Sequence, residues 1–256
     1  MPQLAYTNTM TQAFAGMKAD ARFDEVESFQ AVSALGFGLG VVRGNAYPES
    51  QARLPNVNRV VLTDNAGTFT AGAIAATVNG VVVSTAWGTD KDTTMTAFAA
   101  ALAANVSIDT AVYSSGSHTI TITANSDIEL TITTDVTGVT GTMIISTNVA
   151  TSLDIVRGIS LQTHQDNRTM PVLGASTFVA TGYLANDPVN VLRKGMAWVE
   201  VADAVVENAA VYLITTGADK GKFTDDTTSP NILVPTGVFR SATSGAGIAK
   251  VEINIP

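Results

Sequence analysis

The clearest hydrophobic pattern in the sequence is a tight hairpin near residue 80. Asn79 and Gly80 separate two runs of small and β-branched residues, 73–78 and 81–85. Both turn residues tolerate a positive φ angle, which two-residue hairpin turns require. The pattern therefore predicts two antiparallel strands joined at this turn.

A short helix is predicted directly after the hairpin, over residues 93–104. Met95, Phe98 and Leu102 recur at helical spacing, and several alanines between them favour a helix. Asp92 precedes this run and is placed to cap the first free amides.

A second hairpin is predicted from two alternating runs, 119–123 and 128–133, on either side of the polar residues 125–127. Isoleucine or leucine alternates with threonine or glutamate in both runs, which is typical of strands with one buried and one solvated face. Residues 142–146 are a further strand candidate.

Short strands separated by turn signals return from about residue 153, at the spacing of an all-β sandwich or barrel. The predicted strands are 155–161, 188–192, 196–201, 211–215, 231–234 and 248–255. The last is the most regular, because Ala249, Val251, Ile253 and Ile255 fall on one face and polar residues on the other.

The first 54 residues show a different texture. Tyr6, Phe14, Met17, Phe23 and Phe29 are too irregularly spaced for one amphipathic helix or an alternating strand, so they are interpreted as anchors of an extended segment. The glycine-rich run 36–44 is predicted to be a strand with one face pressed against another backbone.

Composition narrows the functions that such a β-rich chain can have. Only 14% of residues are charged, against roughly a quarter in most soluble domains, which leaves much neutral surface for contact with neighbours. The net charge is −8 with no basic stripe, so neither nucleic acid nor an anionic membrane is an expected partner. No apolar run is long enough for a membrane span, and the first ten residues show no export signal.

Candidate chemistry is sparse. The chain has no cysteine, and its two histidines, His118 and His164, have no second ligand at metal-binding spacing. The glycines at 36, 38 and 40 do not fit a dinucleotide-binding loop, because Val41 stands where the third glycine belongs. We therefore expect no enzyme activity, catalytic residue, metal site or cofactor.

Two stretches of sequence resemble the phage structural cement protein family. The first is the text 13–17 with Asp20 and 26–28, followed by the glycine-rich run that ends at Gly44. The second is the text 191–201, continued by 208–212, 221–224 and 249–253. The segment of about 58–148 lies outside this resemblance.

The resemblance implies a mainly β fold of two domains. A β-sandwich or barrel-like C-terminal domain, assembled with the N-terminal segment, would form a discontinuous capsid-binding domain from residues 1–57 and 149–256. The threonine-rich residues 58–148 would be a small α+β domain inserted at a loop, where insertions are tolerated.

The function implied is that of a decoration or cement subunit on the outer face of a tailed-phage capsid, made in the host bacterial cytoplasm. Its partners would be the major capsid protein and itself, with a homotrimer preferred and a dimer possible. The expected contact residues are Tyr6, Phe14, Met17, Phe23, Arg193 and Lys194. An open alternative is that the apolar residues among these are ordinary core of this chain.

A rival function is a head fibre or adhesin in which the inserted domain binds host glycans. Binding of sugars by stacking needs clustered exposed aromatic residues. The segment 58–148 contains four, Phe69, Trp87, Phe98 and Tyr113. Their exposure decides between the two functions.

Overall fold

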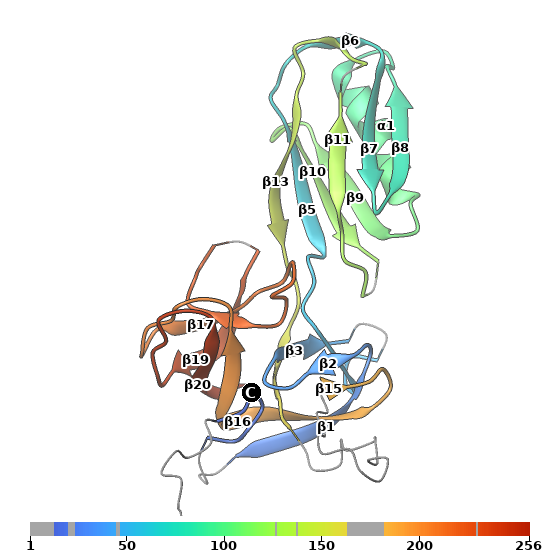
Figure 1. Cartoon of the computed structure of the whole chain (residues 1–256). Coiled ribbons are helices and arrows are strands. Elements are labelled where there is room, and N and C mark those ends of the chain that lie inside the picture. The colour runs from blue at the N-terminus through green and yellow to red at the C-terminus, as the bar shows by residue number, and fades with distance from the viewer. Residues whose placement is uncertain are drawn as a thin grey trace, which may run out of the picture.

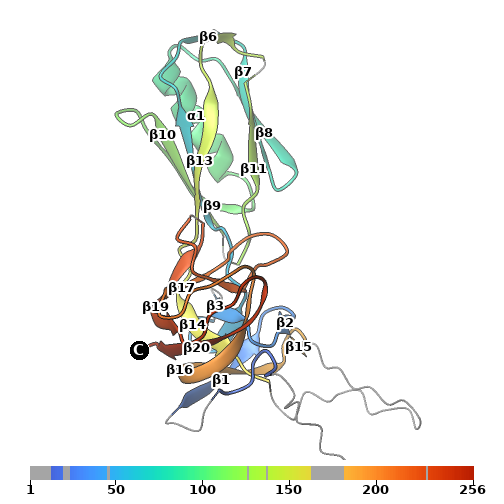
Figure 2. The ribbon, with the colours of Figure 1, turned by 60° about the vertical axis from the view of Figure 1, so that its left-hand side comes forward.

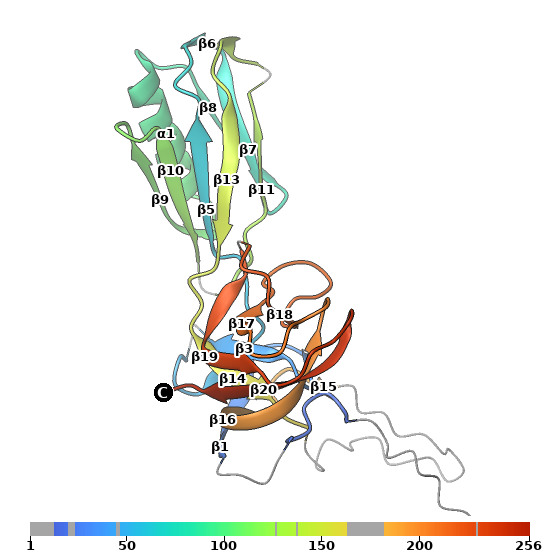
Figure 3. The ribbon, with the colours of Figure 1, turned by 90° about the vertical axis from the view of Figure 1, so that its left-hand side faces the viewer.

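The computed structural model describes residues 13–19, 24–44, 47–125, 127–136, 138–162, 182–228 and 230–256, and its fold is mainly β. The molecule is elongated (Figure 1). Strands β1–β4 and β14–β20 form a base, and strands β5–β13 with helix α1 form a module that stands on it. The module lies at the same end of the base in both turned views (Figures 2 and 3).

The base consists of two closed rings of strands that share one long strand, β16. The first ring runs β1-β4-β3-β14-β16 and closes through β1–β16, and the second runs β16-β18-β17-β19-β20 and closes through β16–β20. The bounds in the first ring are β1 Glu25–Ala31, β3 Gly40–Arg43, β4 Gln51–Arg53, β14 Val156–Ser160 and β16 Pro188–Val201. Those in the second are β17 Ala210–Leu213, β18 Phe223–Thr224, β19 Ile232–Phe239 and β20 Gly247–Asn254. A short pair, β2 Leu35–Gly36 and β15 Gly182–Tyr183, lies beside them.

The base has two apolar clusters, one within the first ring and one in the second ring that extends to Val42, Val156 and Ile159 of the first. Phe29, Leu35, Val41, Tyr183 and Val189 belong to the cluster of the first ring. The cluster of the second ring includes Val199, Val211, Leu213, Phe239 and Val251. The predicted barrel-like domain assembled with the N-terminal segment therefore exists, as a pair of small rings.

Strand β16 passes from one ring to the other at Gly195. Residues 188–194 pair with β1, and residues 194–201 pair with β20. Gly195 has a φ of +128°, which side chains other than glycine rarely allow, and a Cβ there would approach the Asp24 Cβ to 3.0 Å. The strand bends at this residue without ending, so the predicted strands 188–192 and 196–201 are one strand.

The module contains a four-stranded sheet, β13-β5-β10-β9, a three-stranded sheet, β11-β7-β8, and the small pair β12-β6. Helix α1 (Lys91–Ala103) packs against β9 and β8, one strand from each of the larger sheets. The strand bounds are β5 Arg59–Asp64, β6 Phe69–Ala71, β7 Ala73–Val78, β8 Val81–Ala86, β9 Ile108–Ser114, β10 Thr119–Ala124, β11 Ile132–Asp135, β12 Thr140–Gly141 and β13 Ile145–Thr151. Among the residues whose burial is described, the core of the module is formed by residues between 57 and 145.

A buried polar cluster lies where the chain enters and leaves the module. The Arg53 guanidinium donates to both carboxylate oxygens of Asp154, at 2.6 and 3.1 Å. Asp154 also accepts from the backbone amide of Asn56 at 2.7 Å and from the side chain of Asn58 at 2.8 Å. Arg53 pairs in addition with Asp127 in the module at 2.5 Å. These contacts hold the entering and leaving segments together.

Local sequence signals are confirmed where they involve only neighbouring residues. Strands β7 and β8 pair as predicted, with φ angles of 47° at Asn79 and 84° at Gly80. The terminal strand buries Ala249, Val251 and Ile253 on one face.

The predicted hairpin between 119–123 and 128–133 is wrong. Strand β10 pairs with β5 and β9, whereas β11 pairs with β7 in the other sheet. Alternation showed which face of each run is buried but carried no information on the pairing partner. Pairing on both edges of β10 satisfies its backbone groups inside a sheet.

The predicted strand over 36–44 is also wrong as one element. The chain leaves β2 after Gly36, turns at Phe37 and Gly38, and continues in β3 from Gly40. Gly38 has a φ of +67°, and a Cβ there would lie 2.5 Å from the Gly16 amide nitrogen. Close contact with another backbone is thus present, but it requires a turn.

Helix α1 begins two residues earlier than predicted, and its cap is Asp90 in place of Asp92. The Asp90 carboxylate accepts from the Thr93 amide at 2.7 Å, while Asp92 lies in the first turn. The bonds from the Thr93 amide and hydroxyl hold the pKa of Asp90 below its ordinary value.

We expect Asp90→Ala to lower the melting temperature of the protein at neutral pH, because two donors of Thr93 lose their acceptor. The folded-state pKa is depressed, so this stabilisation is present above the ordinary value of 3.8 and is lost as the pH falls through the lower folded value. Circular dichroism melting of wild type and variant should show a difference that narrows in acid. Asp109→Ala, at an exposed position of β9, is the control. A difference that persists unchanged in strong acid would contradict the capping role.

Candidate assembly surface

The N-terminal segment 13–19 lies along strand β16. The Gly16 amide donates to the Trp198 carbonyl at 2.8 Å, the Trp198 amide donates to Met17, and the Ala19 amide donates to Met196. Lys18 and Ala197 form an antiparallel bridge. The segment is therefore held to the base by backbone hydrogen bonds, which leaves its side chains available for other contacts.

Glycine is required where this segment crosses the turn after β2. Gly16 has a φ of +77°, and a Cβ there would lie 2.8 Å from the Gln162 amide nitrogen and 2.9 Å from that of Gly38. Gly16 and Gly38 thus meet with their backbones in contact. The Gly16 carbonyl also accepts from the Gln162 amide at 2.9 Å.

Phe14 and Met17 project from this segment and are partly exposed. Val26 on β1 is exposed to a similar extent. Phe14 and Met17 are therefore not buried in the core of this chain. Their role as contacts to another chain stays a prediction. Tyr6 and Phe23, predicted for the same role, lie outside the described residues, as does His164.

Arg193 and Lys194 lie at the point where β16 passes between the rings, and their environments differ. Arg193 is largely buried and donates to the Glu27 carboxylate at 2.8 Å and to the main-chain oxygen of Pro256. Arg193 therefore binds β1 and the end of β20 to β16. Lys194 is exposed at the bulge opposite Glu25. The Arg-Lys sequence alone could not distinguish these roles.

Several exposed apolar residues of the base were not predicted from the sequence. They are Val26, Leu153, Ile155, Leu184, Val206, Leu233 and Ile248. Exposure depends on which face of a strand is covered by a distant element, and single exposed apolar residues are common on protein surfaces. No local signal could have identified them.

The four aromatic residues of the module contribute to its core. Phe69 and Phe98 are buried, and Trp87 packs edge-on against Phe69 with ring centroids 4.7 Å apart. The Tyr113 hydroxyl donates to Asp92 at 2.9 Å, and burial together with this hydrogen bond raises the pKa of the phenol. The module thus has no cluster of exposed aromatic rings on which sugars could stack.

The described residues also limit other functions. Among them no group of three or more histidine, aspartate or glutamate side chains is placed to hold a metal ion. The helix found in the described part is too short to cross a membrane. His118 has a φ of +52°, and its Nδ1 lies 3.7 Å from the buried Asp64 carboxylate.

A solved structure and a protein-family model are similar to this chain. No curated protein matches it. One solved structure, "The capsid of Myoviridae Phage XM1", contains a chain with 14% sequence identity and a TM-score of 0.46 over 98% of this chain and 96% of that chain.

A protein-family model, described as "Structural cement protein (E217 gp24/Pam3 gp6)", matches residues 92–254. This match includes helix α1 from residue 92 and strands β9–β13, which lie outside the resemblance noted in the sequence. It covers more than half of the chain, including all of β14–β20. The chain belongs to the phage structural cement protein family.

Proposed function

We propose that this protein is a decoration subunit that binds the outer surface of a tailed-phage capsid and stabilises the lattice of the major capsid protein. Membership of the structural cement family is the observation that carries the proposal. The low content of charged residues and the net charge of −8 support a protein partner over nucleic acid or an anionic membrane.

The proposed mechanism is the addition of contact area between capsid subunits. An interface of about 1,600 Å² is typical of specific protein complexes. Repetition of such an interface over a shell sums many moderate affinities, so the shell resists internal pressure without any single very strong contact. Assembly of the subunit as a homo-oligomer, with a trimer preferred and a dimer possible, would add contacts between neighbouring copies.

The elongated shape supports one orientation on the shell. Strand β1 and the N-terminal segment lie at the end of the base opposite the module (Figure 1). We assign the capsid contact to the base, residues 1–57 and 149–256, and treat residues 58–148 as an inserted domain that points away from the shell. This role implies that the protein is made in the bacterial cytoplasm and is then located on the surface of the particle.

The glycan-binding alternative receives no support from the module surface. Its four aromatic residues are engaged in the core or in the bond to Asp92. The large apolar residues exposed on the module are aliphatic: Val81, Val82, Val106, Val112 and Ile144. Aliphatic side chains lack the flat ring faces used for sugar stacking.

The direct test mixes the purified chain with expanded, undecorated shells of the phage that encodes it. We expect co-sedimentation to saturation, and cryo-electron microscopy should show density at symmetry junctions on the outer surface. Failure of the intact, folded chain to bind these shells would refute the proposal.

We expect the double variant Phe14→Ser/Met17→Ser to lower shell affinity by about tenfold or more, because exposed apolar anchors contribute strongly to interfaces. Its melting temperature should stay close to that of the wild type, since both side chains are partly exposed. Co-sedimentation titrations measure the affinity. Val82→Ser/Val112→Ser, which alters exposed apolar residues of the module, should bind shells normally. If both double variants bind shells as tightly as the wild type, Phe14 and Met17 are excluded from the contact.

A further inference from the structure

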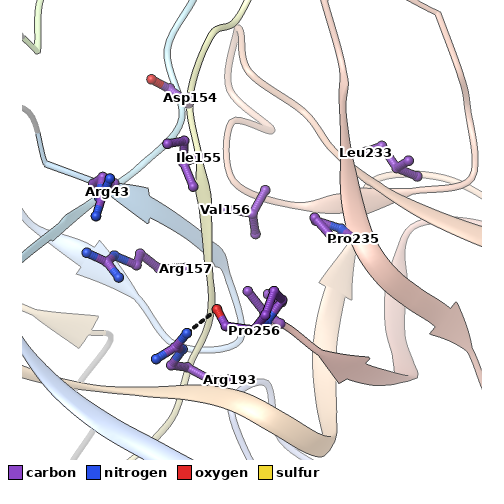
Figure 4. A pocket seen from close by; sticks show the side chains of 10 residues that line it. Arg43, Asp154, Ile155, Val156, Arg157, Arg193, Leu233, Pro235 and Pro256 are labelled. Carbon is purple, nitrogen blue, oxygen red and sulfur yellow. Dashed lines mark hydrogen bonds between the residues drawn. The ribbon is translucent and has the colours of Figure 1, made fainter. Parts of the chain in front are cut away.

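A cleft with a volume of about 420 Å³ lies in the base at the boundary between the two rings. Arg43 at the end of β3, Arg157 on β14 and Arg193 on β16 line one side (Figure 4). Leu233 and Pro235 lie across the cleft from the arginines, with Ile155 between them (Figure 4). Asp154, which is bound to Arg53, and Pro256 also line the cleft. This volume is within the range of small-ligand pockets and accommodates a short peptide segment.

The three arginines have few anionic partners within the chain. Arg43 donates to the Glu49 carboxylate, and Arg157 lies 3.5 Å from the same carboxylate and donates to the Pro48 carbonyl. The Glu49 side chain is 79% exposed, so solvent weakens its interaction with both cations. Arg193 is better compensated, because it donates to Glu27 and to the main-chain oxygen of Pro256 and lies 3.9 Å from Glu25. One exposed carboxylate thus serves two guanidinium groups.

All three arginines have a buried Nε that lacks a hydrogen-bond acceptor among the described residues. A guanidinium group stays charged at any pH that proteins tolerate, and a buried N–H without an acceptor is unfavourable. These Nε atoms are covered by the chain itself, so an external carboxylate would pair with the outer nitrogens of the guanidinium groups.

The apolar side of the cleft indicates that its ligand has apolar groups next to the negative charge. Ile155 and Leu233 are more than half exposed although they are large aliphatic residues. Burial of such side chains by a partner is favourable in proportion to the area covered. A free inorganic anion would leave this side uncovered.

We propose that the cleft binds an acidic segment of the capsid protein, in which a glutamate or aspartate lies next to apolar side chains. The carboxylate pairs with Arg43 and Arg157, and the apolar neighbours cover Ile155 and Leu233. This inference rests on the proposed function, since it names the chemistry of the segment on the shell that the base recognises. The chain as a whole carries a negative net charge, whereas the cleft is lined by three arginines. The cleft would therefore attract a negatively charged segment to this part of the base.

The test uses Leu233→Asp, measured by co-sedimentation with undecorated expanded shells. The new carboxylate would lie in the cleft, across from the arginines, and repel the incoming acid. We expect shell affinity to fall by about tenfold or more. Leu233 is 53% exposed, so the variant should fold. Val206→Asp is the matched control, because Val206 is 65% exposed and does not line the cleft, and it should bind normally.

A second measurement compares the chemical reactivity of the arginines in the free and shell-bound chain. Phenylglyoxal modifies accessible arginines, and mass spectrometry gives the extent at each residue. We expect Arg43 and Arg157 to be protected in wild-type chain bound to shells relative to free chain. Arg240, which pairs with Glu252 outside the cleft, should react equally in both states.

The possible results separate the two proposals. If wild type, Leu233→Asp and Val206→Asp all bind shells equally, the cleft does not hold the capsid segment, although the decoration function stands. If light scattering shows that Leu233→Asp disrupts self-association of the free chain, the occupant is a second copy and the inference is overturned. If wild type binds no shells, both proposals fail.

Discussion

Replacement of Arg53 by methionine is expected to lower the free energy of unfolding by about 4 kcal/mol, as measured by urea denaturation. The Arg53 and Asp154 side chains are 3% and 2% exposed, and two hydrogen bonds join them. Methionine is close in volume but cannot donate, so the Asp154 carboxylate would remain buried without its cation.

The consequence should extend beyond stability. Asp154 also binds the backbone of Asn56 and the side chain of Asn58, which lie on the segment that enters the module. Hydrogen exchange of the Arg53→Met variant should therefore increase first in residues 54–58 and 152–155. Arg240→Met, which breaks the exposed pair with Glu252, should cost less than about 1 kcal/mol. Similar losses in both variants would show that burial of the junction cluster has no special importance.

Replacement of Lys91 by methionine is expected to cost about 3 kcal/mol in the same measurement. Lys91 donates to the Asp64 carboxylate at 2.6 Å, and the Asp64 side chain is fully buried. Asp64 Oδ2 has no hydrogen-bond partner among the described residues, and Oδ1 accepts from the Ala66 amide at 2.7 Å and from Lys91. Lys91 is closer to this carboxylate than His118, whose Nδ1 lies 3.7 Å away. Loss of the ammonium leaves an uncompensated charge in the module.

A double-mutant cycle tests this explanation. Asp64→Asn removes the buried charge with little change in volume, so Lys91→Met/Asp64→Asn should be more stable than the sum of the single losses predicts. Strict additivity of the two losses would show that the pair is not coupled. Lys222→Met, at a partly exposed pair with Asp219, is a control with a small expected effect.

The parts of the fold that could be predicted depend on neighbouring residues. The turn at Asn79 and Gly80 specifies β7 and β8 by itself, because its backbone angles suit few other residues. The spacing of Met95, Phe98 and Leu102 likewise specifies α1, and all three are buried. The pairing of β10 with β5 joins residues about sixty positions apart, for which a single sequence offers no local signal. The pairing of β10 with β9 is a hairpin across residues 115–118, which the sequence analysis did not identify.

The two-ring base was predictable only as a barrel-like domain. Closure of the first ring needs β1, and its Phe29 looks in the sequence like one more member of an irregular aromatic series. The bend at Gly195 also reads as a turn between two strands, since glycine is common in both settings. Whether Phe29 is a core residue and whether Gly195 lies within one strand both depend on how distant strands pack against each other.

The candidate contact residues were predictable to a smaller extent. Phe14 and Met17 are partly exposed on the segment where the sequence placed them, but Arg193 is engaged within the chain. The cleft was not predictable at all, because Arg43, Arg157 and Arg193 are far apart in the sequence and meet only through the ring pairings.

The strand shared by the two rings has a mechanical consequence. Residues 188–194 of β16 pair in the first ring and residues 194–201 in the second, so one unbroken strand joins the two rings. Tension applied to one ring passes to the other along a continuous covalent backbone, with no separable domain boundary between them to give way first. In the role proposed for this protein, load on one ring would therefore reach the other through the backbone of β16.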